Sequence, residues 1–82
     1  MKKITVKVKP PADIPIRGEF IRLDAFLKLA NAVESGGQAK LEIQDSHVRV
    51  NGEICAQRGK KLRPGDVVRL RGQGYRVIGQ QG

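Results

Sequence analysis

The sequence contains few of the residues that build disulfides, metal centres and aromatic stacking surfaces. Its 82 residues include one cysteine, one histidine, one tyrosine, two phenylalanines and no tryptophan. Cys55 alone cannot form an internal disulfide, and with His47 it cannot supply the four protein ligands of a structural zinc site. We therefore expect no metal and no cofactor. The core must come from Ile, Val and Leu, together with Phe20 and Phe26.

Long apolar segments are also missing. No apolar run approaches the roughly 20 residues that span a bilayer. The basic Met1-Lys2-Lys3 start is not followed by the apolar stretch of a secretory signal. A chain of this length is one small domain. We expect a soluble, cytoplasmic protein with no membrane partner.

Acidic residues are scarce relative to basic ones, 8 against 16, which gives a formal charge of +8. Residues 1–9 carry four lysines and no acid, and residues 49–76 carry eight bases and two acids. The segment between them, residues 10–48, has four bases and six acids. Charge concentrated in this way suits a polyanionic partner. Charge alone does not separate RNA from DNA or from acidic lipid.

The N-terminal part changes character at its prolines. Residues 3–8 alternate apolar and polar side chains, which predicts a half-buried strand. Pro10, Pro11 and Pro15 follow, and proline interrupts regular elements. We therefore predict an irregular, extended connector over residues 10–18.

Two short helices are predicted next. The first has an apolar stripe at helix spacing, formed by Leu23, Phe26, Leu27 and Ala30. The second opens on a capping box, in which the Ser35 hydroxyl accepts from the Gln38 amide and the Gln38 side chain returns to the Ser35 amide. It should run from about Gly36 to Asp45 and bury Ala39 and Ile43. The tight connection makes the pair a helix hairpin.

The second half of the chain has strand and turn signals. Val48-Arg49-Val50 alternates, and Asn51-Gly52 is a strong signal for a type I′ hairpin turn. Pro64-Gly65-Asp66 predicts a further turn, followed by strands at residues 67–70 and 75–78. Together the elements predict an α+β fold.

The motifs, taken in order, resemble the S-four RNA-binding domain. They are Arg22-Leu23-Asp24 with Leu27, Ser35 with Ala39, Val48-Arg49-Val50-Asn51-Gly52, and Gly65-Asp66 after Pro64. The match covers about 47 of the 82 residues. The chain looks like the short standalone bacterial members, which also carry Ser-Gly-Gly-Gln-Ala and Arg-Gly-Lys-Lys-Leu.

The resemblance implies a fold and a function. It implies a helix hairpin on a small, mostly antiparallel sheet, here with an extra N-terminal strand, and a link to ribosomes or structured RNA such as rRNA or tRNA. We expect the RNA-binding domain at residues 20–79, the strand and connector at residues 1–19, and a frayed tail at residues 80–82. The chain departs from the family at Gly36, where many members have Arg. It departs again at Glu42, an apolar position in the family for which Leu41 should compensate.

RNA binding requires cations that follow a phosphate backbone and polar groups that read shape. The two helices, the β-hairpin and the loop after it supply such side chains. The candidate RNA-binding residues are Arg22, Lys28, Gln38, Lys40, Arg49, Arg58, Lys60, Lys61 and Arg63. Each also has a plainer interpretation: Arg22 could pair only with Asp24 or Glu19, and the loop cations could be a solvated run.

Other functions fit less well. An enzyme is not expected, because there is no catalytic set around His47, no metal cluster and no nucleotide-binding loop. Duplex DNA binding is disfavoured because Lys40 stands beside Glu42 and Asp45 on the second helix. We therefore expect a noncatalytic, monomeric RNA-binding protein without a small-molecule substrate. The alternative is a protein-interaction module whose basic face docks an acidic partner.

Overall fold

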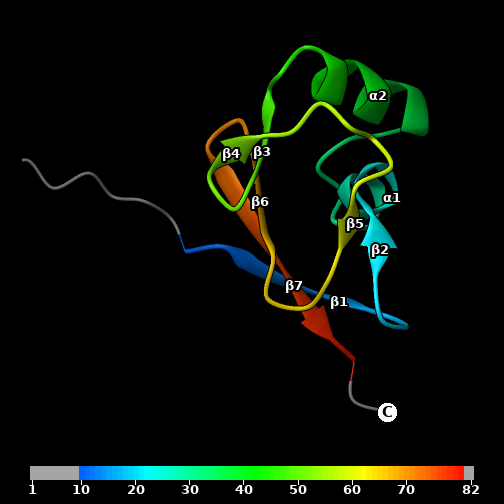
Figure 1. Ribbon diagram of the computed structural model, residues 1–82, viewed down its shortest axis with the longest axis vertical. Helices are drawn as coiled ribbons and strands as arrows, with labels where there is room; N and C mark the ends of the chain where they lie inside the picture. Colours follow the sequence, from blue (N-terminus) through cyan, green and yellow to red (C-terminus); the bar gives the residue numbers. More distant parts are fainter. Residues whose placement is uncertain (1–9, 81–82) are drawn as a thin grey trace, which may run out of the picture.

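Residues 10–80 are described by a computed structural model, in which two helices pack against a five-stranded sheet (Figure 1). The predicted α+β fold, with a helix pair on a mostly antiparallel sheet, is confirmed. The strand predicted at residues 3–8 lies outside the described residues. The elements in chain order are β1 (Ala12–Ile16), β2 (Ile21–Arg22), α1 (Leu23–Leu29), α2 (Gly36–Gln44), β3 (Val48–Val50), β4 (Glu53–Ile54), β5 (Lys61–Leu62), β6 (Val67–Leu70) and β7 (Gln73–Gly79).

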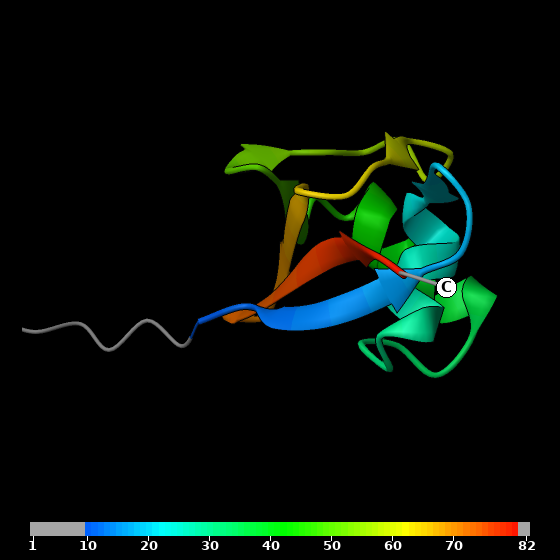
Figure 2. The ribbon, with the colours of Figure 1, turned by 90° about the horizontal axis from the view of Figure 1, so that it is seen from below.

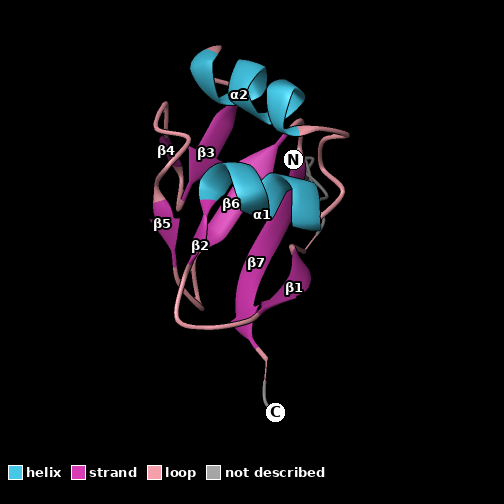
Figure 3. Cartoon of the chain, turned by 90° about the vertical axis from the view of Figure 1, so that its right-hand side faces the viewer, coloured by secondary structure: helices cyan, strands magenta, loops and turns pink. Residues whose placement is uncertain are grey.

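The main sheet joins the two ends of the described chain. Its strand order is β1-β7-β6-β3-β4, and every pairing is antiparallel except β1 with β7. Figure 2 shows β1 running alongside β7. A separate two-stranded ladder pairs β2 with β5. Both helices lie on the same side of the main sheet (Figure 3), which leaves the other face without a helix among residues 10–80.

The prediction of an irregular connector at residues 10–18 is wrong, because five of these residues form β1. Pro15 lies inside this strand and is paired with Ile78. An edge strand tolerates proline, since it needs backbone hydrogen bonds on one side only, and β7 is the single neighbour of β1 within the described part of the chain. Ile14 and Ile16 point toward the core, and Ile16 is buried.

The helix starts follow the sequence signals closely. Ser35 is the N-cap of α2, and its hydroxyl accepts from the Gln38 amide at 3.1 Å. The returning bond differs from the prediction by one residue, because the Gln38 side chain accepts from the Glu34 amide at 2.8 Å and not from Ser35. The first bond satisfies one of the amides that an α-helix leaves unpaired at its start, and the second ties the residue before the N-cap to the first turn.

The core lies between the helices and the sheet. Leu23, Phe26 and Leu27 of α1 are fully buried, as the apolar stripe predicts. Phe20 is not in the core, contrary to the prediction: it is 43% exposed, and the Lys61 ammonium lies 4.8 Å from its ring centroid. Phe20 directly precedes β2, and the Lys61 side chain of the paired strand β5 covers its ring.

Helix α2 buries an acidic residue, Glu42, at a position where the resemblance implies an apolar side chain. Glu42 is buried, and its carboxylate accepts from Arg71 and lies 2.8 Å from Nδ1 of His47. The expected compensation by Leu41 is wrong, since Leu41 is 61% exposed. Glu42 is accommodated by polar partners from the next loop and from the β6–β7 turn.

The Asn51-Gly52 turn has a further role beyond reversing the chain. Both residues have positive φ, 51° and 88°, as a type I′ turn requires. The Asn51 side chain also donates to Asp66 at 3.1 Å and accepts from the Val67 amide at 2.9 Å. The hairpin is thereby fastened to the start of β6.

Replacement of Asn51 should therefore destabilise the fold. Asn51→Ala removes two hydrogen bonds and places a side chain that disfavours positive φ in the turn, for an expected loss of about 2 kcal/mol. Asn51→Gly removes the same bonds but suits the backbone, so it should cost less. Urea unfolding of both variants tests this, and an unchanged midpoint for Asn51→Ala would contradict it.

Candidate functional site

Several predicted cations meet where the loop after the hairpin crosses the start of α1. The amide of Leu23 donates to the carbonyl of Lys60 at 2.8 Å. The β2–β5 ladder places Arg22 directly opposite Lys61. The backbone thus brings together chain segments about 40 residues apart in sequence. We call this surface the basic edge: Arg22, Lys28, Arg58, Lys60 and Lys61.

A shallow cleft runs along one side of the basic edge. It has a volume of about 320 Å³ and is lined by Arg22, Asp24, Ala25, Lys28 and Gly36. Gly36 is the first residue of α2, so the cleft joins cations of α1 to the start of the second helix. Gly36 leaves open space beside it, since a β-carbon there would meet no atom within 4 Å.

Most of the basic edge is free of carboxylate partners. Arg22 is paired with Asp24 at 3.1 Å, as its plainer interpretation predicts. Its side chain stays 55% exposed, and an exposed ion pair of this kind contributes little stability. Within residues 10–80, no ion pair involves Lys28, Arg58, Lys60 or Lys61. The edge therefore presents a net positive charge.

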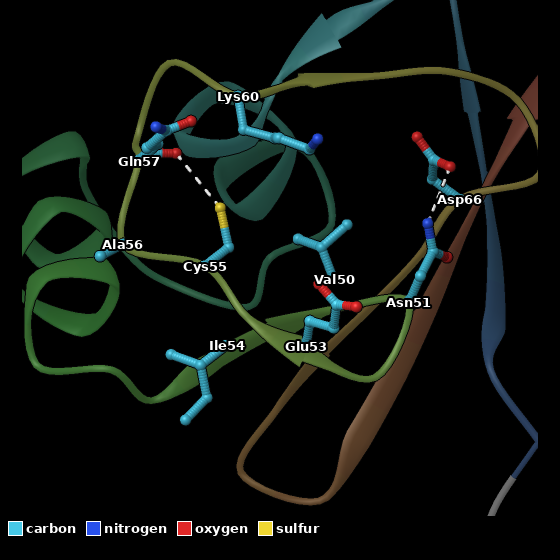
Figure 4. A pocket seen from close by; sticks show the side chains of 9 residues that line it. All are labelled: Val50, Asn51, Glu53, Ile54, Cys55, Ala56, Gln57, Lys60 and Asp66. Carbon is cyan, nitrogen blue, oxygen red and sulfur yellow. Dashed lines mark hydrogen bonds between the residues drawn. The ribbon is translucent and has the colours of Figure 1, made fainter.

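Lys60 also reaches into a second pocket, next to the basic edge. This pocket lies between the β3–β4 hairpin and the following loop and has a volume of about 590 Å³. Figure 4 shows the Lys60 side chain pointing into it, with Val50 and Cys55 beneath and Asp66 on the far side. Asp66 is already occupied, since it accepts from Asn51 and from the Arg63 amide.

The candidates on α2 are divided between two sides of the helix. Lys40 stands four residues after Gly36, so it lies on the helix face that borders the cleft. Gln38 lines another pocket together with Glu42 and Arg71. Its carbonyl oxygen is used by the capping bond to Glu34. Gln38 is therefore separated from the basic edge.

The remaining two candidates lie on strands. Arg63 directly follows β5 and, like Lys61, is exposed, with the buried Leu62 between them. Arg49 is exposed between the buried Val48 and Val50. Because the side chains of a strand alternate between faces, Arg49 points away from the helices. It does not join the basic edge.

Three further arginines on or beside strands of the main sheet are not among the predicted RNA-binding residues. They are Arg69 on β6, Arg71 in the turn after it, and Arg76 on β7. The signal was present, since Val67-Val68-Arg69-Leu70 alternates in the same way as Val48-Arg49-Val50. Their positions relative to one another depend on strand pairing, which the sequence alone does not provide.

Residues 10–80 contain neither a membrane-spanning helix nor a cluster of metal ligands. Neither α1 nor α2 has the length and apolar character needed to cross a membrane. No group of three or more His, Cys, Asp and Glu side chains within the described range is placed to hold a metal ion.

Comparison with known proteins places this geometry in a family. Residues 14–78 match the model of the S4 domain. The chain is 48% identical over 66 residues to the probable ribosome maturation protein RlbA of Bacillus subtilis, covering 79% of this chain and 93% of that protein.

A solved structure agrees. The solution structure of YbcJ from E. coli, described as revealing an ALFAL motif involved in RNA-binding, matches with a TM-score of 0.66 and 26% identity. The alignment covers 94% of this chain and 99% of YbcJ. The matched family model, the sequence kinship and the shared fold show that this chain belongs to the S4 domain family.

Proposed function

We propose that the protein binds structured RNA, with rRNA as its target, through the basic edge and the adjoining cleft. The observation that carries the proposal is the gathering of five exposed cations, four of them without a carboxylate partner within residues 10–80. Lys40 and Arg63 extend the surface at its two sides. The family supports RNA as the polyanion, and kinship to a protein named for ribosome maturation supports a ribosomal target.

Recognition by shape fits these side chains better than recognition of unpaired bases. Stacking on single strands uses several exposed rings. The aromatic ring of Phe20 lies next to the basic edge, and the Lys61 ammonium covers it. The edge offers guanidinium and ammonium groups to phosphates. The protein acts as a monomer in the cytoplasm, without catalysis.

Salt dependence tests the mechanism. If the basic edge neutralises about five phosphates, the plot of log affinity against log salt should have a slope of roughly −3.5 to −4.5. A folded RNA hairpin and a DNA hairpin of equal length should be titrated in parallel, with RNA the tighter ligand. A flat salt response for RNA would remove the proposal.

A second experiment, recovery of the protein from cell extract, tests the alternative of an acidic protein partner. Tagged protein should be recovered from cell extract with and without nuclease treatment. Under the proposal, its co-purifying material is RNA and is lost after nuclease. Recovery of a single acidic protein that survives nuclease would support the alternative and contradict the proposal.

A further inference from the structure

The face of the sheet turned away from the helices carries a row of arginines on three neighbouring strands. Arg49 on β3 stands directly opposite Arg69 on β6. Arg76 on β7 stands opposite Val67, which is two residues from Arg69 and therefore on the same face. We call this set the outer-face row: Arg49, Arg69 and Arg76.

Arg69, the middle residue of the row, lies against a glycine of the neighbouring strand. Gly74 of β7 is the partner of Arg69 across the ladder. A β-carbon at Gly74 would stand 3.2 Å from Nη1 and 3.3 Å from Cζ of Arg69, and 3.2 Å from the β-carbon of Pro11. These spacings are tighter than nine in ten β-carbon contacts in real proteins, so a side chain at this position would require Arg69 or Pro11 to shift. The guanidinium of Arg69 therefore rests against the β7 backbone, in space that the absence of a side chain provides.

The charges of the row are poorly compensated. Like charges directly across a ladder destabilise a sheet, and Arg49 and Arg69 are such a pair. Neither of them has a carboxylate partner among residues 10–80, and Arg49 donates to the carbonyl of Gly52 at 3.2 Å. Arg76 has one exposed partner, Asp13, at 3.4 Å. An anionic ligand would offset this repulsion.

The row cannot serve the same stretch of RNA as the basic edge. The helices and the β2–β5 ladder lie on one side of the main sheet (Figure 1, Figure 3). The row faces the other side, because Arg49 alternates with the buried Val48 and Val50, and the strand pairing places Arg69 and Arg76 on the face of Arg49. We propose that the outer-face row is a second RNA site, which binds the phosphates of a separate RNA segment so that one protein bridges two segments. The inference rests on the proposed function of the basic edge.

The experiment measures bridging directly. An RNA hairpin is immobilised, the full-length protein is bound to it, and capture of a second, fluorescent hairpin is recorded at 0.1 M salt. The variants are R49Q/R69Q/R76Q and its charge-retaining match R49K/R69K/R76K. Wild type and the Lys variant should capture the second hairpin. The Gln variant should bind the first hairpin normally but lose capture by roughly a hundredfold, the effect of three phosphate contacts at this salt concentration.

The outcomes separate the two proposals. Binding of the first hairpin with equal capture by wild type and the Gln variant would overturn the second site and leave the basic edge intact. No binding of the first hairpin by wild type would overturn both. If the Gln variant unfolds in a thermal melt, R49Q/R76Q leaves Arg69 against Gly74 and provides the same test with two contacts. Undiminished capture by that variant would also overturn the second site.

Discussion

Replacing the five cations of the basic edge with glutamine should abolish RNA binding at moderate salt. The variant carries Gln at Arg22, Lys28, Arg58, Lys60 and Lys61. Each phosphate contact contributes roughly 0.7 to 0.9 to the log–log salt slope, so five contacts correspond to about four orders of magnitude in affinity at 0.1 M salt. Fluorescence anisotropy with a labelled hairpin would measure this loss.

The fold should survive this change. All five side chains are exposed, and surface substitutions usually change stability by less than about 0.5 kcal/mol. R22K/R58K provides the matched control: it retains the charge and should retain most of the salt slope. If the five-residue variant binds RNA as wild type does while its thermal melt is unchanged, the basic edge is not the RNA site.

The largest effect on stability is expected for Phe26→Ala. Phe26 is the largest fully buried side chain, at the centre of the face that α1 presents to the core. Truncating a buried phenylalanine costs about 3 to 5 kcal/mol. A domain of this size has roughly 4 to 12 kcal/mol in total. The loss is at least about a quarter of that total, so the variant should unfold at a markedly lower urea concentration than the wild type.

A matched control stands on the same helix. Leu29 is 50% exposed, so Leu29→Ala removes a similar apolar group that is only partly buried and should change stability by less than about 1 kcal/mol. Circular dichroism during urea unfolding would compare the two. Equal midpoints for Phe26→Ala and Leu29→Ala would show that the core is not centred on α1. Since α1 carries Lys28 and begins next to Arg22, Phe26→Ala should also weaken RNA binding.

Local signals predicted the elements that depend on local chemistry. The Ser35 cap, the apolar stripe of α1 and the Asn51-Gly52 turn are each specified within a few residues, and the structure has all three. The family motifs also predicted the α+β class.

Long-range pairing accounts for what the sequence did not predict. Pro15 predicts a break, yet the pairing of β1 with β7, more than 60 residues later, makes it a strand residue. Glu42 predicts a gap in the apolar face of α2, yet Arg71, 29 residues away, allows its burial. Arg49 and Lys60 belong to one basic region of the sequence, but strand alternation and the path of the loop separate them. The conformation of Pro15, the burial of Glu42 and the separation of Arg49 from Lys60 all depend on contacts between segments distant in sequence.

The position of β7 has a consequence for how the protein matures during synthesis. Strand β7 is the last of the described strands to be made, and it lies between β1, the first of them, and β6. Until the ribosome has released residues 73–79, β1 has no partner in the main sheet. Larger proteins can fold from the N-terminus while translation continues. The main sheet can close only once residues 73–79 have been made, so a nascent chain that stops before them would leave the facing edges of β1 and β6 unpaired.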